Sequence, residues 1–140
     1  MIEINNTLSR FANSFDLKDW TALKGVLAEN VTVDYADLRG NAETLSRDQY
    51  VAQREASLQE LNTHHILGNI DIEMKNGGAI VAASAMIYRS LGEEYFNSHV
   101  VYGFNLEMIN SSWRITSIKQ TVLWNEGNSK IHTGAKTYSK

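Results

Sequence analysis

The chain contains no cysteine and has no excess of basic residues. The absence of cysteine excludes disulfide bonds, thiolate chemistry and zinc sites with cysteine ligands. A formal net charge of −3 over 140 residues argues against a nucleic-acid partner, because phosphate binding needs a basic surface. The chain does not open on a basic segment followed by an apolar run, and no apolar stretch approaches the ~18 residues of a membrane-spanning helix. We therefore expect a cytoplasmic protein without a membrane partner.

What is present is ordinary globular composition, with 43% hydrophobic and 21% charged residues. A chain of 140 residues has the length of one domain. We assign residues 1–126 to this domain and residues 127–140 to a polar C-terminal tail, in which we expect His132 to lie on the surface.

Apolar side chains recur at helical spacing in the first part of the chain. They predict an amphipathic helix from Ile4 to Phe15, with Asp16 ending it and capping a second helix over residues 17–27. Residues 31–35 alternate as a strand with Tyr35 inward, and residues 36–45 are expected to form a loop. Ser46 and Gln49 form a capping box that opens a third helix, which we expect to end at about Leu61.

After Leu61 the apolar period changes from helical to alternating. Turns at residues 76–78, 91–94 and 109–112 separate four predicted strands, and a change of parity in the last strand indicates a bulge near Thr116 and Ser117. Residues 79–89 are apolar on both faces, so we expect a second copy to cover the outer face, in a homodimer or homotrimer. The fold class predicted is α+β, with a curved antiparallel sheet wrapped around three N-terminal helices and a cone-shaped pocket between them.

Two adjacent histidines lie where the third helix gives way to the first long strand. Imidazole is the side chain best suited to proton transfer near neutral pH, so an active site is expected here. Extending the Ile70, Ile72 and Met74 face backward points His64 into the pocket, whereas a kink at Gly68 would point His65 inward. Adjacent strand residues face opposite sides, so the two histidines cannot share a metal ion, and no metal site is predicted.

The order of the elements and several short segments resemble the nuclear-transport-factor-2-like superfamily. Within that superfamily, the chain most resembles the branch of scytalone dehydratases and SnoaL-like polyketide cyclases. The segments that carry it include FANSFDLKDW at residues 11–20, VDY at 33–35 and THHILG at 63–68, and the resemblance extends over about residues 4–126. It implies a cone-shaped fold that holds a small hydrophobic or aromatic ligand and needs no cofactor.

Carried over position by position, the resemblance makes His65 the general acid and base, Asp16 the carboxylate that orients it, and Tyr35 a phenol that binds the substrate oxygen. The chain departs from the branch at Phe15, where the branch has tyrosine. It departs again at Tyr102, where the dehydratases have a second histidine, although His99 could take that place if the strand register slipped. The residues expected to contact the substrate are Tyr102, Phe15, Trp20, Phe104 and Gln120.

Three functions remain open from the sequence. The first is a cofactor-independent dehydratase or isomerase acting on a small cyclic ketone, phenolic or polyketide-like substrate. The second is a module that binds such a molecule without turnover, and the third is a structural oligomerisation domain. A fainter resemblance, through Asp71 and Arg89, is to epoxide hydrolases of the same fold, but the spacing fits poorly.

Overall fold

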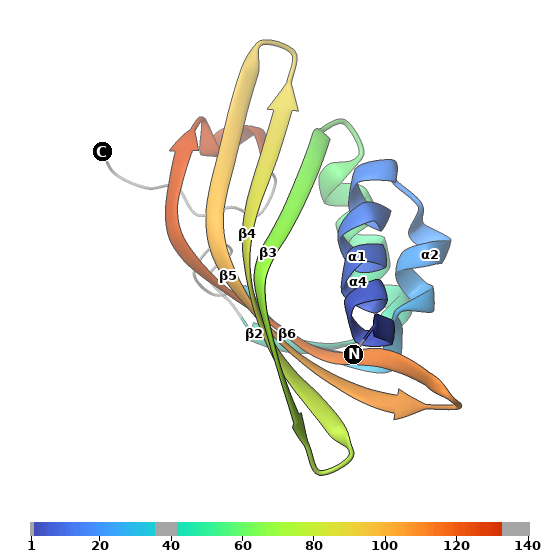
Figure 1. Ribbon diagram of the computed structural model, residues 1–140. Coiled ribbons are helices and arrows are strands. Elements are labelled where there is room, and N and C mark those ends of the chain that lie inside the picture. Colours follow the sequence, from blue (N-terminus) through green and yellow to red (C-terminus); the bar gives the residue numbers. More distant parts are fainter. Residues whose placement is uncertain (1, 36–41, 133–140) are drawn as a thin grey trace.

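A computed structural model describes residues 2–35 and 42–132 (Figure 1). Its helices are α1 (Ile2–Leu17), α2 (Trp20–Gly25), α4 (Arg47–Leu58) and the 3₁₀ turn η1 (Ser129–Ile131). Its strands are β1 (Leu27–Asp34), β2 (Ala42–Ser46), β3 (Asn62–Lys75), β4 (Gly78–Leu91), β5 (Glu94–Ile109) and β6 (Ser112–Gly127).

The strands form one six-stranded sheet in the order β2-β1-β6-β5-β4-β3. The sheet is strongly curved, and α1, α2 and α4 lie on its concave side (Figure 1). This confirms the α+β fold with three helices held by a curved sheet. One pair differs from the expected antiparallel arrangement, because β1 runs parallel to β6. Alternation within a strand reports which face is buried and carries no information on the direction of its neighbour.

Several elements begin or end elsewhere than expected from the sequence. Strand β1 begins at Leu27, whereas its start was expected at Val31 and Leu27 was assigned to the second helix. Residues 42–46 form β2, which pairs with β1, whereas a loop was expected; residues 36–41 of that loop lie outside the described part of the chain. The helix α2 is shorter than expected and is capped by Asp19, whose side chain accepts a hydrogen bond from the backbone of Ala22, so the prediction that Asp16 caps it is wrong. The capping box of Ser46 and Gln49 is confirmed, although α4 ends at Leu58.

A bulge in β3 decides which histidine faces the helices. The pairing with β4 shifts by one residue between Gly68 and Asp71, and Asn69 there has a positive φ of 49°. After the bulge Ile72 pairs with the buried Val81, and before it His65 pairs with the buried Ile87. The extra residue reverses the side-chain parity, so His65 lies on the inner face and His64 is exposed.

The bulge predicted in the last strand is confirmed. Ile115 pairs with Leu106 and Ser117 with Asn105, so Thr116 is the extra residue. A second shift, which the sequence did not indicate, lies where His99 pairs with Trp124 and Val100 with Val122, so Leu123 of β6 is the extra residue.

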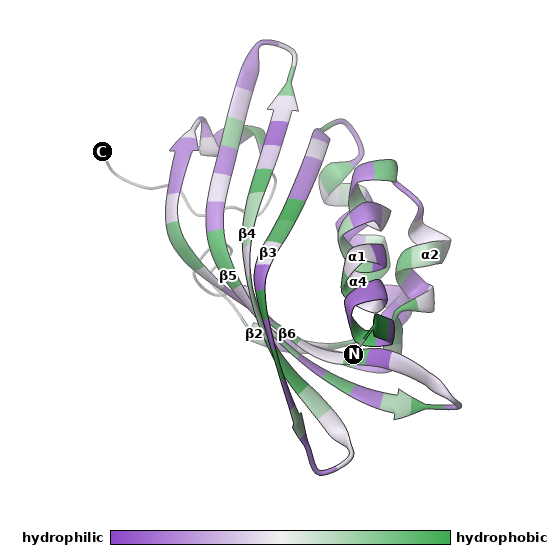
Figure 2. Cartoon of the chain, viewed as in Figure 1, coloured by the Kyte–Doolittle hydropathy of each residue, from purple (hydrophilic) through white to green (hydrophobic). Residues whose placement is uncertain are grey.

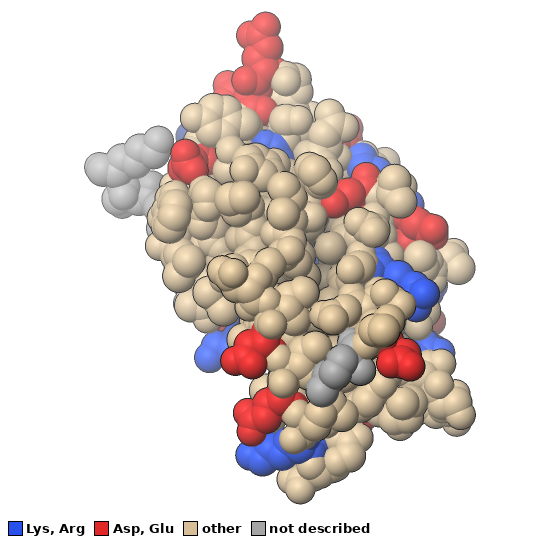
Figure 3. All heavy atoms as spheres, viewed as in Figure 1, with Lys and Arg blue, Asp and Glu red and all other residues tan. Residues whose placement is uncertain are grey.

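The core lies between the concave face of the sheet and the helices. Odd residues of β4 and even residues of β5 are buried, and Figure 2 shows the resulting alternation of hydrophobic and hydrophilic bands along the strands. Burial of each large apolar side chain contributes about 1.5–3 kcal/mol. The opposite face of the sheet also carries large apolar side chains that are 38–56% exposed: Ile66, Ile80, Met86, Tyr88, Leu123 and Trp124. A broad area over the upper part of the sheet, as viewed in Figure 3, carries few charged side chains.

Candidate active site

The carboxylate of Asp16, in the last turn of α1, binds the start of β3. It accepts hydrogen bonds from Thr63 Oγ1 at 3.0 Å and from the backbone N–H of His65 at 2.8 Å. Its Oδ1 lies 2.6 Å from Nδ1 of the same histidine. An ionised carboxylate can only accept, so Nδ1 carries the proton and donates it. The other ring nitrogen, Nε2, is then left with its lone pair, which is the form that a general base requires.

The His65 side chain is only 7% exposed, and its ring stacks on Phe15 with centroids 5.1 Å apart. Burial lowers the pKa of His65 below its ordinary value, and this outweighs the hydrogen bond and the negative charge of Asp16, which raise it. The positive charge of Arg89 lowers the pKa further. His65 is therefore neutral at pH 7 and able to accept a proton.

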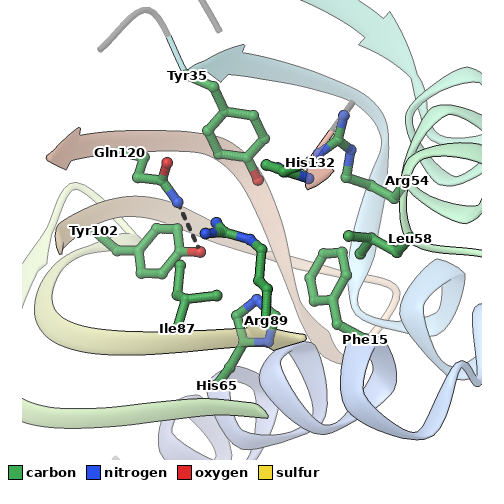
Figure 4. A pocket seen from close by; sticks show the side chains of 10 residues that line it. All are labelled: Phe15, Tyr35, Arg54, Leu58, His65, Ile87, Arg89, Tyr102, Gln120 and His132. Carbon is green, nitrogen blue, oxygen red and sulfur yellow. Dashed lines mark hydrogen bonds between the residues drawn. The ribbon is translucent and has the colours of Figure 1, made fainter. Parts of the chain in front are cut away.

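The His65 ring faces a cavity that lies between the sheet and α4 (Figure 4). Its lining residues are Phe15, Tyr35, Arg54, Leu58, His65, Ile87, Arg89, Tyr102, Gln120 and His132. The volume of the cavity is about 30 Å³. That is room for one or two water molecules, so a larger ligand requires lining side chains to move.

Two phenols present hydroxyl groups at the cavity. Tyr35 Oη lies 2.6 Å from Tyr50 Oη, and Tyr102 Oη accepts a hydrogen bond from Gln120 Nε2 at 3.1 Å. Because that bond occupies an oxygen lone pair, the Tyr102 proton is left for another acceptor. Burial raises the pKa of Tyr102 well above its ordinary value, which keeps this proton in place at neutral pH.

Two arginines also reach the cavity, Arg54 from α4 and Arg89 from β4, and both are at least 95% buried. Arg89 Nη1 donates to Ser98 Oγ at 2.8 Å and to the carbonyl oxygen of Phe96 at 3.4 Å. Burial and, to a smaller extent, the positive charge of Arg54 lower the pKa of Arg89 to about 10, so it stays charged at pH 7. The guanidinium of Arg54 lies over the rings of Tyr35 and Tyr50.

Five of the residues expected at the site line the cavity together: Phe15, Tyr35, His65, Tyr102 and Gln120. Asp16 lies behind His65. Two expected contacts are absent from the lining: Trp20 packs edge-on against Phe15, and Phe104 stacks on Tyr102. These two rings support lining residues.

Three lining positions were missed or wrongly placed. His132 is 4% exposed and lines the cavity, so the prediction that it lies on the surface is wrong. Arg54 could have been found, because it falls on the same helical stripe as Val51 and Leu58. Arg89 continues the buried odd positions of β4, a pattern that could also have placed it in the cavity.

His99, the alternative considered for the position of Tyr102, lies on the outer face of the sheet, where it stacks on Trp124.

Over residues 2–35 and 42–132, no three histidine, aspartate or glutamate side chains gather as metal ligands would. None of the helices in that part of the chain is both long and apolar enough to span a membrane.

Residues 1–119 match the family model of the SnoaL-like domain, and the chain belongs to this family. Scytalone dehydratase arp1 of Aspergillus fumigatus is 22% identical, and the alignment covers 89% of this chain and 83% of that protein. The crystal structure of the Kfla4162 protein of Kribbella flavida superposes with a TM-score of 0.87 at 24% identity, covering 93% of this chain and 94% of that one. A hexachlorocyclohexane dehydrochlorinase, LinA type 2, superposes with a TM-score of 0.78 at 14% identity, covering 94% and 90%. An NTF2-like family protein of Streptomyces avermitilis shares the fold as well, with a TM-score of 0.73 at 13% identity, covering 87% of this chain and 94% of that one.

Proposed function

We propose that the chain is a cofactor-independent enzyme of the dehydratase or isomerase type, acting on a small cyclic ketone, phenolic or polyketide-like substrate. The observation that carries the proposal is the buried contact of 2.6 Å between His65 Nδ1 and Asp16. A cavity lined only by aromatic and aliphatic groups would have favoured a binding module. A neutral histidine oriented by a carboxylate favours proton transfer instead.

In the proposed reaction, Nε2 of His65 removes a proton from the carbon next to a carbonyl group. The electron pair of the broken C–H bond moves to form an enolate, whose oxygen accepts hydrogen bonds from Tyr102 and Tyr35. For dehydration, the imidazolium returns its proton to the departing hydroxyl group, which leaves as water. For isomerisation, the proton returns to a different carbon. Asp16 stabilises the imidazolium in both cases.

The named relatives support elimination as the class of reaction. The name of the A. fumigatus protein is that of a dehydratase, and the LinA name is that of a dehydrochlorinase. Both words describe removal of a proton together with a leaving group.

The test begins with a screen of cyclic ketones and phenols for thermal stabilisation and turnover. With a substrate in hand, His65→Asn should lower kcat by about 10²–10⁴-fold, because the base is lost while the side-chain volume is largely kept. The matched control is His64→Asn, since His64 is adjacent but exposed. If both variants retained the rate of the parent within a factor of two, His65 would not be the base.

We also propose that the chain forms a homodimer or homotrimer through the outer face of the sheet. The exposed apolar side chains of β3, β4 and β6 on that face support this assembly, because monomeric proteins rarely leave so many large apolar groups in water. The cytoplasmic location stays a prediction, which fractionation of cells would test.

A further inference from the structure

We propose that the substrate carries a carboxylate, which Arg54 and Arg89 bind inside the cavity. This inference rests on the proposed function, because it takes the same cavity as the substrate site. It goes beyond that function by requiring a negative charge on a substrate that the family resemblance would leave neutral.

The first argument is the charge balance of the cavity. Arg54 and Arg89 contribute two positive charges, and Asp16 contributes one negative charge next to a neutral His65. Neither guanidinium has a carboxylate partner within ion-pair distance among the residues that the structure describes. Buried charges are normally paired, because removing an unpaired ion from water is strongly unfavourable.

The second argument is the set of unused donors. Arg54 is 5% exposed, and its Nε and Nη2 atoms are buried without a hydrogen-bond partner in the described part of the chain. Its contacts are with the faces of two tyrosine rings, which attract a cation but accept no conventional hydrogen bond from it. On Arg89, the hydrogen bonds to Phe96 and Ser98 occupy only Nη1. A guanidinium presents five N–H donors in a planar fork that matches a carboxylate.

The third argument is the position of these donors relative to the base. Figure 4 shows the side chain of Arg89 extending across the middle of the lining residues, between His65 and Tyr102, with Arg54 on the side of α4. A carboxylate bound there would place the rest of the substrate beside His65 and the Tyr102 hydroxyl. It would also supply the negative charge that balances the two guanidinium groups. A carboxylate is planar and small, so it suits a narrow cavity better than a tetrahedral phosphate does.

The experiment compares carboxylic acids with their neutral amides. Benzoate, salicylate and cyclohexanecarboxylate are titrated into the full chain at pH 7, with the three corresponding carboxamides as matched probes, and binding is followed by calorimetry and thermal shift. At least one carboxylate is expected to bind the parent protein about tenfold or more tightly than its amide. Arg54→Met and Arg89→Met should each weaken carboxylate binding about ten- to hundredfold and leave amide binding unchanged. Arg10→Met, which removes an exposed charge on α1, should change neither.

Equal binding of acid and amide in every pair, or carboxylate binding that survives both arginine substitutions, would overturn the inference. Two arginine variants are included so that one remains informative if the other does not fold. The variant His65→Asn separates this inference from the proposed function, because the variant should lose turnover and still bind carboxylates. Arginine-dependent binding without His65-dependent turnover would support the carboxylate site and refute the enzyme. Turnover of a neutral substrate that depends on His65, with no preference for acids, would support the enzyme and refute the carboxylate site.

Discussion

Replacing Asp16 with asparagine should reverse the tautomer of His65, and this can be tested without a substrate. The backbone N–H of His65 can only donate, so the single amide oxygen of the new asparagine must take the place of the carboxylate oxygen 2.8 Å away. The amide NH₂ group then faces His65 Nδ1, where the other carboxylate oxygen had been. Nδ1 must become the acceptor, and the ring proton moves to Nε2. The nitrogen proposed as the base is thereby blocked.

The same contacts set the magnitude of the effect on stability. All three hydrogen bonds of Asp16, with Thr63 Oγ1, the backbone N–H of His65 and His65 Nδ1, change from charge-assisted to neutral, at about 1 kcal/mol each. The expected loss is about 3 kcal/mol in the free energy of unfolding, or roughly 9–15 °C in Tm for a domain of this size. Long-range ¹H–¹⁵N NMR spectra at pH 7.5 distinguish the tautomers, and urea unfolding gives the free energy. A parent protein with its proton on Nε2, or an Asp16→Asn variant with its proton still on Nδ1, would refute the reasoning.

Three further predictions concern stability and assembly. Because the pKa of His65 is lowered in the folded protein, the unfolded chain binds a proton at this histidine more readily. The contribution of His65 to the free energy of unfolding should therefore be complete above pH ~6.5 and decrease as the pH falls toward the lower folded-state pKa. His65→Asn should flatten this dependence in urea unfolding at several pH values, whereas His64→Asn should not. Leu123→Glu on the outer face should dissociate the proposed oligomer, as measured by light scattering, and a monomeric parent at roughly 50 µM would contradict that assembly. Ser46→Ala should lower the free energy of unfolding by about 0.5–2 kcal/mol through loss of the capping box, and an unchanged urea midpoint would contradict this.

The sequence predicted the fold well, because apolar periodicity reports burial directly. The capping box at Ser46 and the bulge at Thr116 were local patterns, and both were confirmed. The parallel neighbour of β1 was not predicted, since pairing between distant segments leaves no local pattern. The strand β2 was missed because Leu45 is its only buried residue, so it shows no apolar alternation.

The site was only partly predictable, for a physical reason that differs between residues. Strand parity alone pointed to His64, and the resemblance pointed to His65, which the structure places on the inner face. Arg54 lies on a buried helical stripe, which pointed to the cavity, but arginine is rarely buried, so its residue type argued against burial. His132 belongs to a polar segment with no periodic pattern, and only the three-dimensional arrangement shows it at the cavity.

The bulge at Asn69 joins two parts of β3 that are held in place independently. Before it, Asp16 fixes the strand through Thr63 and His65; after it, the tight turn at Asn76 and Gly77 fixes the pairing with β4. The extra residue at the bulge lets the contacts with Asp16 and the pairing set by the turn form in the same strand. Deleting Asn69 would therefore force a choice, in which either the histidine turns away from the helices or the hairpin shifts its partners by one. A change of two residues would keep the side-chain parity but would displace one of these two parts by about 6.6 Å along the strand. An engineer grafting the site onto another sheet would therefore need to transfer the irregularity along with the side chains.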